Sequence, residues 1–299
     1  MNKGRGLNSF EIYGLAIGAN LAYSSASLIY SLYAKRFSSI WINQIKVLTA
    51  FVAFSMAMLI GQRFVSLSHP SLGFLLLSGF SGLCLGDIFI FRAFRTLGAS
   101  RSLIIYSFQP LLLSIYGYIF LKQILRPQDL LAFLSMVTCV FIFMLERNKN
   151  TGSWDIKSFL WAFLGICLDA IGIILTRTAY DAQPELETFQ VNTVRCLGAI
   201  AGFILLSPRG YFHVFKDLKN LKYREQSLVI TSSFIGCFLS LTMYLAALKH
   251  AHVGMLTSIA ITGPVWVSLL ECIYERKAPS RFLLGAFSFF IFGFYLMVS

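Results

Sequence analysis

Long uninterrupted runs of apolar residues constrain the fold of this chain more than any other feature of its sequence. A helix crosses the hydrocarbon core of a bilayer, about 30 Å thick, with about 20 apolar residues. Ten stretches of about that length lie at roughly 11–33, 39–61, 72–91, 102–121, 128–146, 156–178, 188–207, 227–248, 253–273 and 281–298. Their apolar character is continuous rather than alternating, which disfavours a lipid-facing β-barrel. We therefore predict an all-α integral membrane protein with ten transmembrane helices.

The composition excludes the common classes of soluble protein. Of the 299 residues, 57% are hydrophobic and 13% are charged, whereas soluble domains carry about 45–50% apolar and about 25% charged residues. The six cysteines fall inside predicted helices and are expected to be buried apolar side chains. Hydrolase and nucleotide-binding motifs are absent, and His250-x-His252 has no third ligand nearby. We expect no enzymatic activity, no cofactor and no bound metal.

The net charge of +12 is carried mainly by loops between the apolar stretches. This distribution favours anionic lipid headgroups over nucleic acid as the partner of the basic residues. The longest connection, 208–226, alternates apolar residues with cations, which is compatible with a short interfacial helix or with an unstructured basic loop. The count of lysines and arginines on each side predicts that both termini lie outside.

The two halves of the chain resemble each other. Residues 42–54 align without gaps to 191–203. Matched pairs in the two halves are Asn43 and Asn192, Lys46 and Arg195, Gly82 and Gly236, Ala93 and Ala247, and Pro110 and Pro264. The alignment predicts two five-helix repeats, over residues 1–150 and 151–299.

A repeat with five spans must enter the membrane from opposite sides in its two copies. We therefore predict that the two halves are inverted about an axis in the membrane plane. Inverted repeats recur in secondary transporters, which place the substrate near the bilayer midplane between the halves.

Four charged residues, Lys46, Asp87, Asp169 and Arg195, lie within the predicted spans. A charge at membrane depth costs at least about 2.5–3.5 kcal/mol on insertion scales, so such residues usually face a cavity or a partner. The four residues are compatible with a substrate or proton site, or with ion pairs that only hold helices together.

Pro110 and Pro264 occupy matched positions within predicted helices. Helix breaks at corresponding places in two repeats point to a binding site, although an ordinary kink that shapes packing would leave the same pattern. We expect the cavity to be lined by Lys46, Arg195, Asp87, Asp169, Tyr106, Gln109, Asn43, Asn192, Asn20 and Trp266. Small residues at a spacing of four, namely Ser78, Gly82 and Gly86, then Gly198 and Gly202, are expected to allow close helix packing.

Several motifs resemble those of one transporter group. The stretch from Leu85-Gly86-Asp87 to Phe91-Arg92-Ala93, followed by Leu97-Gly98-Ala99-Ser100-Arg101 and Pro110, is similar to the third and fourth helices of the ten-helix EamA-type group of the drug/metabolite transporter superfamily. Ala247-Leu248, Pro264 and Glu275-Arg276 extend the resemblance to the second half, whereas Lys122-Gln123 departs from a frequent Gly-Glu. The resemblance implies a central cavity, alternating access, small organic solutes and, against the charge count, cytoplasmic termini.

We therefore expect a secondary transporter for an amino acid-like, anionic, zwitterionic or drug-like metabolite, with proton-coupled export as one option. A lipid-linked carrier or flippase on the same scaffold is the alternative. The expected partners are a small-molecule substrate, the bilayer and protons, with no nucleic acid. The protein is expected in the plasma membrane of a bacterium, as a monomer or a weak homodimer.

Overall fold

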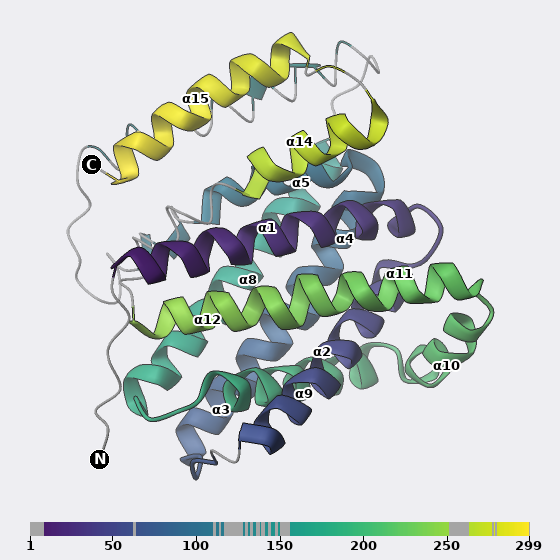
Figure 1. Cartoon of the computed structure of the whole chain (residues 1–299), viewed down its shortest axis with the longest axis vertical. Helices are drawn as coiled ribbons and strands as arrows, with labels where there is room; N and C mark the ends of the chain where they lie inside the picture. Colours follow the sequence, from purple (N-terminus) through teal and green to yellow (C-terminus); the bar gives the residue numbers. More distant parts are fainter. Residues whose placement is uncertain are drawn as a thin grey trace.

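The computed structural model describes residues 9–61, 64–109, 156–250, 263–276, 278 and 280–298, with scattered positions between 112 and 149. Every element in these ranges is a helix, and the helices pack into a bundle (Figure 1). In the first half they are α1 (Ser9–Ala34), α2 (Ser39–Gly61), α3 (His69–Ser78), η1 (Gly79–Gly86), α4 (Asp87–Leu97), α5 (Ala99–Ile105) and η2 (Tyr106–Phe108). In the second half they are α8 (Ile156–Ala182), α9 (Thr188–Leu206), α10 (Pro208–Lys219), α11 (Tyr223–Ser233), η3 (Phe234–Leu239), α12 (Ser240–His250), α14 (Gly263–Glu275) and α15 (Arg281–Val298).

Six helices in the described ranges are long and apolar enough to cross a membrane. They are Phe10–Ala34, Ser39–Gly61, His69–Leu97, Ile156–Ala182, Thr188–Leu206 and Tyr223–His250. Each coincides with one of the predicted stretches. Of the other four predicted spans, 281–298 coincides with α15, whereas 102–121, 128–146 and 253–273 fall partly or largely outside the described residues, and α5 and α14 overlap the first and the last of these three. The total of ten therefore stays a prediction.

Local sequence signals explain where the third span begins and ends. Ser68 caps its start by accepting a hydrogen bond from the backbone N–H of Ser71 at 3.3 Å, and Pro70 lies in the first turn, where its missing N–H is not needed. The helix ends at Gly98, whose φ of 83° lies in the region that glycine adopts without strain. The span is therefore a continuous helix from His69 to Leu97.

The third and eighth predicted spans each contain a π-helical segment. These segments are η1, Gly79–Gly86, and η3, Phe234–Leu239. Gly82 and Gly236, which the repeat matches, lie inside them. π-helical turns are rare and frequently occur at functional sites. Their presence at matched positions was not anticipated from the sequence and favours a structural relation between the two halves.

The helices of the two halves interlock. The first helix, α1, packs against η3, α12 and α14 of the second half, and α8 packs against α3, η1 and α4 of the first half. The pair α2 and η3 has its counterpart in α9 and η1, and α2 packs directly on α9. This reciprocal exchange is what a pseudo-twofold relation would produce, and the opposite insertion of the halves stays a prediction.

Close packing between the halves depends on glycines. A Cβ atom on Gly79 would lie 1.7 Å from the carbonyl oxygen of Arg195, and one on Gly198 would lie 2.1 Å from the carbonyl oxygen of Leu76. Gly86 makes a similar approach to α8, where a Cβ would lie 3.1 Å from the carbonyl oxygen of Gly165. The expectation that the small-residue stripes bring helix backbones together is confirmed at Gly86 and Gly198.

The basic connection between the seventh and eighth predicted spans is partly helical. Of the two alternatives, helix or unstructured loop, the structure shows the helix α10 over Pro208–Lys219. Lys216 and Lys219 lie in its last turn, where cations interact favourably with the helix dipole. In Figure 1, α10 lies at the end of the bundle where α11 begins.

Candidate functional site

A cavity of about 110 Å³ lies between the helices of the two halves. Its wall is built from α1, α2, η1, α4, α5, η2, α8, α9, η3, α12 and the start of α14. Seven of the ten predicted site residues line it, namely Asn20, Lys46, Asp87, Tyr106, Gln109, Asp169 and Arg195. All four charges predicted within the spans therefore meet at one place.

Lys46 and Asp87 form a buried ion pair. The Nζ atom of Lys46 donates a hydrogen bond to Oδ2 of Asp87, and the exposed fractions of the two side chains are 3% and 9%. Lys46 comes from α2, and Asp87 is the first residue of α4, directly after the π segment η1. The Nζ atom also lies 5.3 Å from the ring centroid of Phe91. The charge of Lys46 is therefore compensated within the first half.

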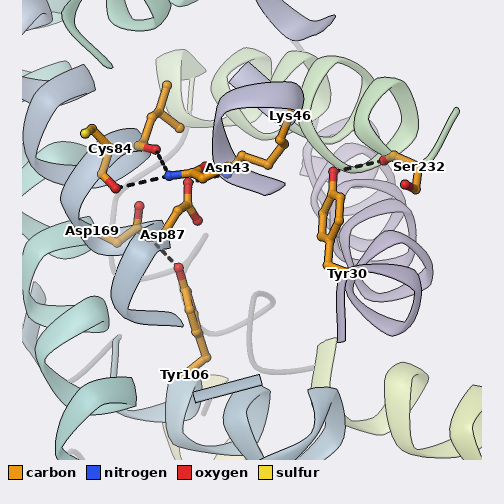
Figure 2. Close-up of polar contacts among 9 residues, drawn as sticks. Tyr30, Asn43, Lys46, Cys84, Asp87, Tyr106, Asp169 and Ser232 are labelled. Carbon is orange, nitrogen blue, oxygen red and sulfur yellow. Dashed lines mark hydrogen bonds and ion pairs between the residues drawn. The ribbon is translucent and has the colours of Figure 1, made fainter. Parts of the chain in front are cut away.

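Asp169, on α8, is held by two neutral donors. Its Oδ2 atom accepts a hydrogen bond from the hydroxyl of Tyr106 at 3.1 Å and from Nε2 of Gln109 at 2.6 Å. Figure 2 shows the Tyr106 side chain pointing at this carboxylate. No Lys, Arg or His nitrogen of the described residues lies within 4.0 Å of it. The carboxylate is positioned but has no cationic partner.

Arg195, on α9, is only 2% exposed and is also held by neutral groups. Its Nε donates to the hydroxyl of Ser78 at 3.0 Å, and its Nη1 donates to Oδ1 of Asn192 at 3.3 Å. The Ser78 hydroxyl in turn lies 2.7 Å from that of Thr176. In the described part of the chain no carboxylate lies within 4.0 Å of the guanidinium. The cavity therefore holds one closed ion pair and two opposite charges that are not paired with each other.

The matched asparagines support the site from outside the cavity. The side-chain amide of Asn43 donates to the carbonyl oxygens of Leu83 at 2.8 Å and Cys84 at 3.1 Å, both within η1 (Figure 2). Asn192 orients Arg195 as described above. Neither residue lines the cavity. The structure thus places both as supports of the helices and side chains around it.

Two tyrosine hydroxyls at the cavity have no hydrogen-bond partner among the described residues. They belong to Tyr23 on α1 and Tyr244 on α12. Buried polar atoms are usually paired, so these hydroxyls are available to a solute or to water. The indole nitrogen of Trp266 is also buried and unpartnered, but Trp266 does not line the cavity.

The predicted helix breaks at Pro110 and Pro264 lie at or beyond the edges of the described residues. Pro110 lies outside the described residues. Pro264 is the second residue of α14, and residues 251–262 before it are likewise outside the described part of the chain. The residue before it, Gly263, lines the cavity, and its carbonyl oxygen accepts a hydrogen bond from Ser24 at 2.9 Å, which joins α14 to α1.

Sequence reasoning missed several contributors to the site. The spacing of small residues predicts only a packing role for Ser78, yet its hydroxyl accepts a hydrogen bond from Arg195. Thr176 extends that chain by donating to the carbonyl oxygen of Gly172 at 2.9 Å. The available signal was a hydroxyl residue in each of two apolar spans, with nothing in the sequence to show that they meet.

The repeat alignment also reveals an asymmetry in the site. In the alignment of the two halves, the offset of 149 residues between Asn43 and Asn192 aligns Asn20 with Asp169. The offset of 154 residues between Pro110 and Pro264 aligns Asp87 with Leu241. The second half therefore lacks the acid that compensates the cation of the first half.

Comparisons with known proteins agree with this architecture. The sequence model of the EamA-like transporter family matches residues 11–145. No curated protein matches the chain in sequence. Twenty-four chains of solved structures match, and one, titled "Crystal structure of protein", has a TM-score of 0.69 with 16% identity over 97% of this chain and 96% of that chain. At this identity the likeness shows a shared fold.

Proposed function

We propose that this chain, whose residues 11–145 match the sequence model of the EamA-like transporter family, is a secondary transporter that moves a small organic solute across the membrane by alternating access. The family match supports a transporter of the drug/metabolite type, and the cavity between the interlocked halves supports the finer mechanism. Two bundles related by an inverted repeat can rock about a central site and open it to each side in turn.

The unpaired charges of Arg195 and Asp169 are the observation that carries the proposal. If the charges served packing alone, we would expect closed pairs such as Lys46 with Asp87. Arg195 and Asp169 instead line the cavity, and only neutral groups hold them. Because charges at membrane depth are costly without a partner, we infer that the solute supplies the missing partners.

The chemistry of the wall favours an anionic or zwitterionic solute. The guanidinium of Arg195 can bind a carboxylate, and the carboxylate of Asp169 can accept hydrogen bonds from an ammonium group. The hydroxyls of Tyr23 and Tyr244 add further polar contacts. The volume of about 110 Å³ suits a small metabolite such as an amino acid-like solute.

Asp169 is also the proposed site of proton coupling. It is the cavity carboxylate without a cationic partner among the described residues, so it can change its protonation without breaking an ion pair. Release of solute on one face could then follow proton binding, which would give proton-coupled export. We further propose a location in the bacterial plasma membrane and a monomer or weak homodimer as the working unit.

A flux screen tests the function. The purified protein is reconstituted into liposomes loaded with a defined mixture of small carboxylates, zwitterions and amines, and each compound that leaves is measured by mass spectrometry. We expect protein-dependent efflux of one class of small carboxylate or zwitterion. Efflux no faster than from empty liposomes for every compound, together with protein-dependent scrambling of labelled lipids, would favour the flippase alternative.

A further inference from the structure

A second cavity, of about 390 Å³, lies between α1 and the helix formed by α11 and η3. Among its lining residues are Ala26 and Ile29 of α1 and Arg224, Thr231 and Ile235 of the facing helix. We call this cavity the α1–α11 groove. It shares no lining residue with the central cavity, so it is a separate site.

The groove runs from the edge of the membrane inward. Arg224 is in the first turn of the helix Tyr223–His250, which is long and apolar enough to span a bilayer. The residues of this helix that line the groove extend from Arg224 to Ile235 along one face. The eleven residue steps between them, at a rise of 1.5 Å each, give the groove a length of about 16 Å. The groove therefore extends about halfway across a hydrocarbon core of about 30 Å.

The lining changes from charged to apolar along this length. Arg224 has no acidic side chain within 4.0 Å among the described residues, whereas the adjacent Glu225 is paired with Arg36 at 2.5 Å. Ser227 and Thr231 contribute hydroxyls below the arginine. Ser25 and Ser232 also line the inner part, but their hydroxyls donate to carbonyl oxygens of their own helices, so Ala26, Ile29 and Ile235 make it mainly apolar. A ligand that fits needs an anionic head and an apolar tail.

The surroundings of the charged end are also basic. Five cations, Arg209, Lys216, Lys219, Lys222 and Arg224, accompany two acids, Asp217 and Glu225, between residues 207 and 226. Helix α10 carries several of them and lies at the end of the bundle where α11 begins (Figure 1). Basic segments at a membrane surface attract anionic lipids. The charge around the groove is thus complementary to an anionic headgroup.

We propose that the α1–α11 groove binds one anionic glycerophospholipid. Its phosphate lies on Arg224, its glycerol region lies beside Ser227 and Thr231, and one acyl chain lies along Ala26, Ile29 and Ile235. The site does not depend on the transport proposal, because it uses none of the cavity residues.

Lipid titration tests the proposal. The full-length protein, purified in detergent and stripped of lipid, is titrated with palmitoyl-oleoyl phosphatidylglycerol or phosphatidylcholine, and bound lipid is counted by native mass spectrometry. We expect the wild type to bind the first phosphatidylglycerol about fivefold more tightly, the effect of one cation near anionic lipid. Arg224→Gln should remove this preference. Lys157→Gln, which removes an exposed cation on α8, should retain it.

Other outcomes overturn the proposal. They are equal binding of the two lipids by wild type, a preference retained in Arg224→Gln, or a loss of preference in both variants, which would indicate diffuse surface charge. A second variant, Thr231→Trp, keeps the charge and fills the groove at an exposed position. It should lower occupancy by phosphatidylglycerol, and unchanged occupancy contradicts the site even if Arg224→Gln does not fold.

Discussion

Lys46 on α2 and Arg195 on α9 occupy matched positions of the repeat, yet only the lysine has an acidic partner in the described structure. Lys46 is paired with Asp87, whereas Arg195 is held by the neutral side chains of Ser78 and Asn192. The residue matched to Asp87 is Leu241. We infer that Lys46 stabilises the fold and that Arg195 binds the solute.

The first prediction concerns the stability of the ion pair. Lys46→Met leaves Asp87 buried without a cation, and breaking a buried pair in this way destabilises a protein by about 3–5 kcal/mol. The double variant with Asp87→Leu, the residue at the matched position, should recover most of that loss. Thermal unfolding in detergent compares the two variants, and a double variant no more stable than Lys46→Met would show that the pair is not the source of stability.

The second prediction concerns proton coupling at Asp169. Asp169→Asn removes the titratable group but keeps an oxygen that can accept hydrogen bonds from Tyr106 and Gln109. In liposomes, a proton gradient opposed to the solute gradient should speed efflux by wild type and leave efflux by the variant unchanged. Wild-type flux that ignores the gradient, with unchanged flux in Asp169→Asn, rules out the coupling but not the transport.

The third prediction concerns the contact between α9 and the start of η1. Gly79→Ala places a methyl group 1.7 Å from the backbone oxygen of Arg195, so the helices must separate, at a cost of about 1–3 kcal/mol. Gly73→Ala is the matched control, because a Cβ there meets no atom within 4 Å. Thermal unfolding should show a lower midpoint for Gly79→Ala alone, and equal midpoints for both variants would contradict the close approach.

The membrane spans and the buried charges were accessible from the sequence, because each depends on local properties of the chain. The six long helices coincide with apolar stretches, and residues as far apart as Lys46 and Arg195 line one cavity. Exposing a charged side chain to lipid is costly, so a charge within an apolar helix usually faces a polar cavity or a partner. The position of the four charged residues around one cavity follows from that cost.

The partners of those charges could not be predicted in the same way. Which acid meets Lys46 depends on the rotation and the crossing of two helices, and Asp87 follows directly after the π segment η1, which no local motif of the sequence predicted. The amide of Asn43 binds carbonyl groups within one such segment, although the sequence suggested that it faces the solute. Ser78 gave no sign of its contact with Arg195 for the same reason.

The most direct test is the flux of the transported solute through liposomes that contain wild type, Arg195→Gln or Lys157→Gln. Because Arg195 has no acidic partner among the described residues, its loss should leave the protein folded while efflux falls at least about tenfold, the effect of one lost charge-assisted hydrogen bond. Lys157→Gln should transport as wild type does. Folded Arg195→Gln that transports the solute at the wild-type rate would contradict a role for this residue in solute binding.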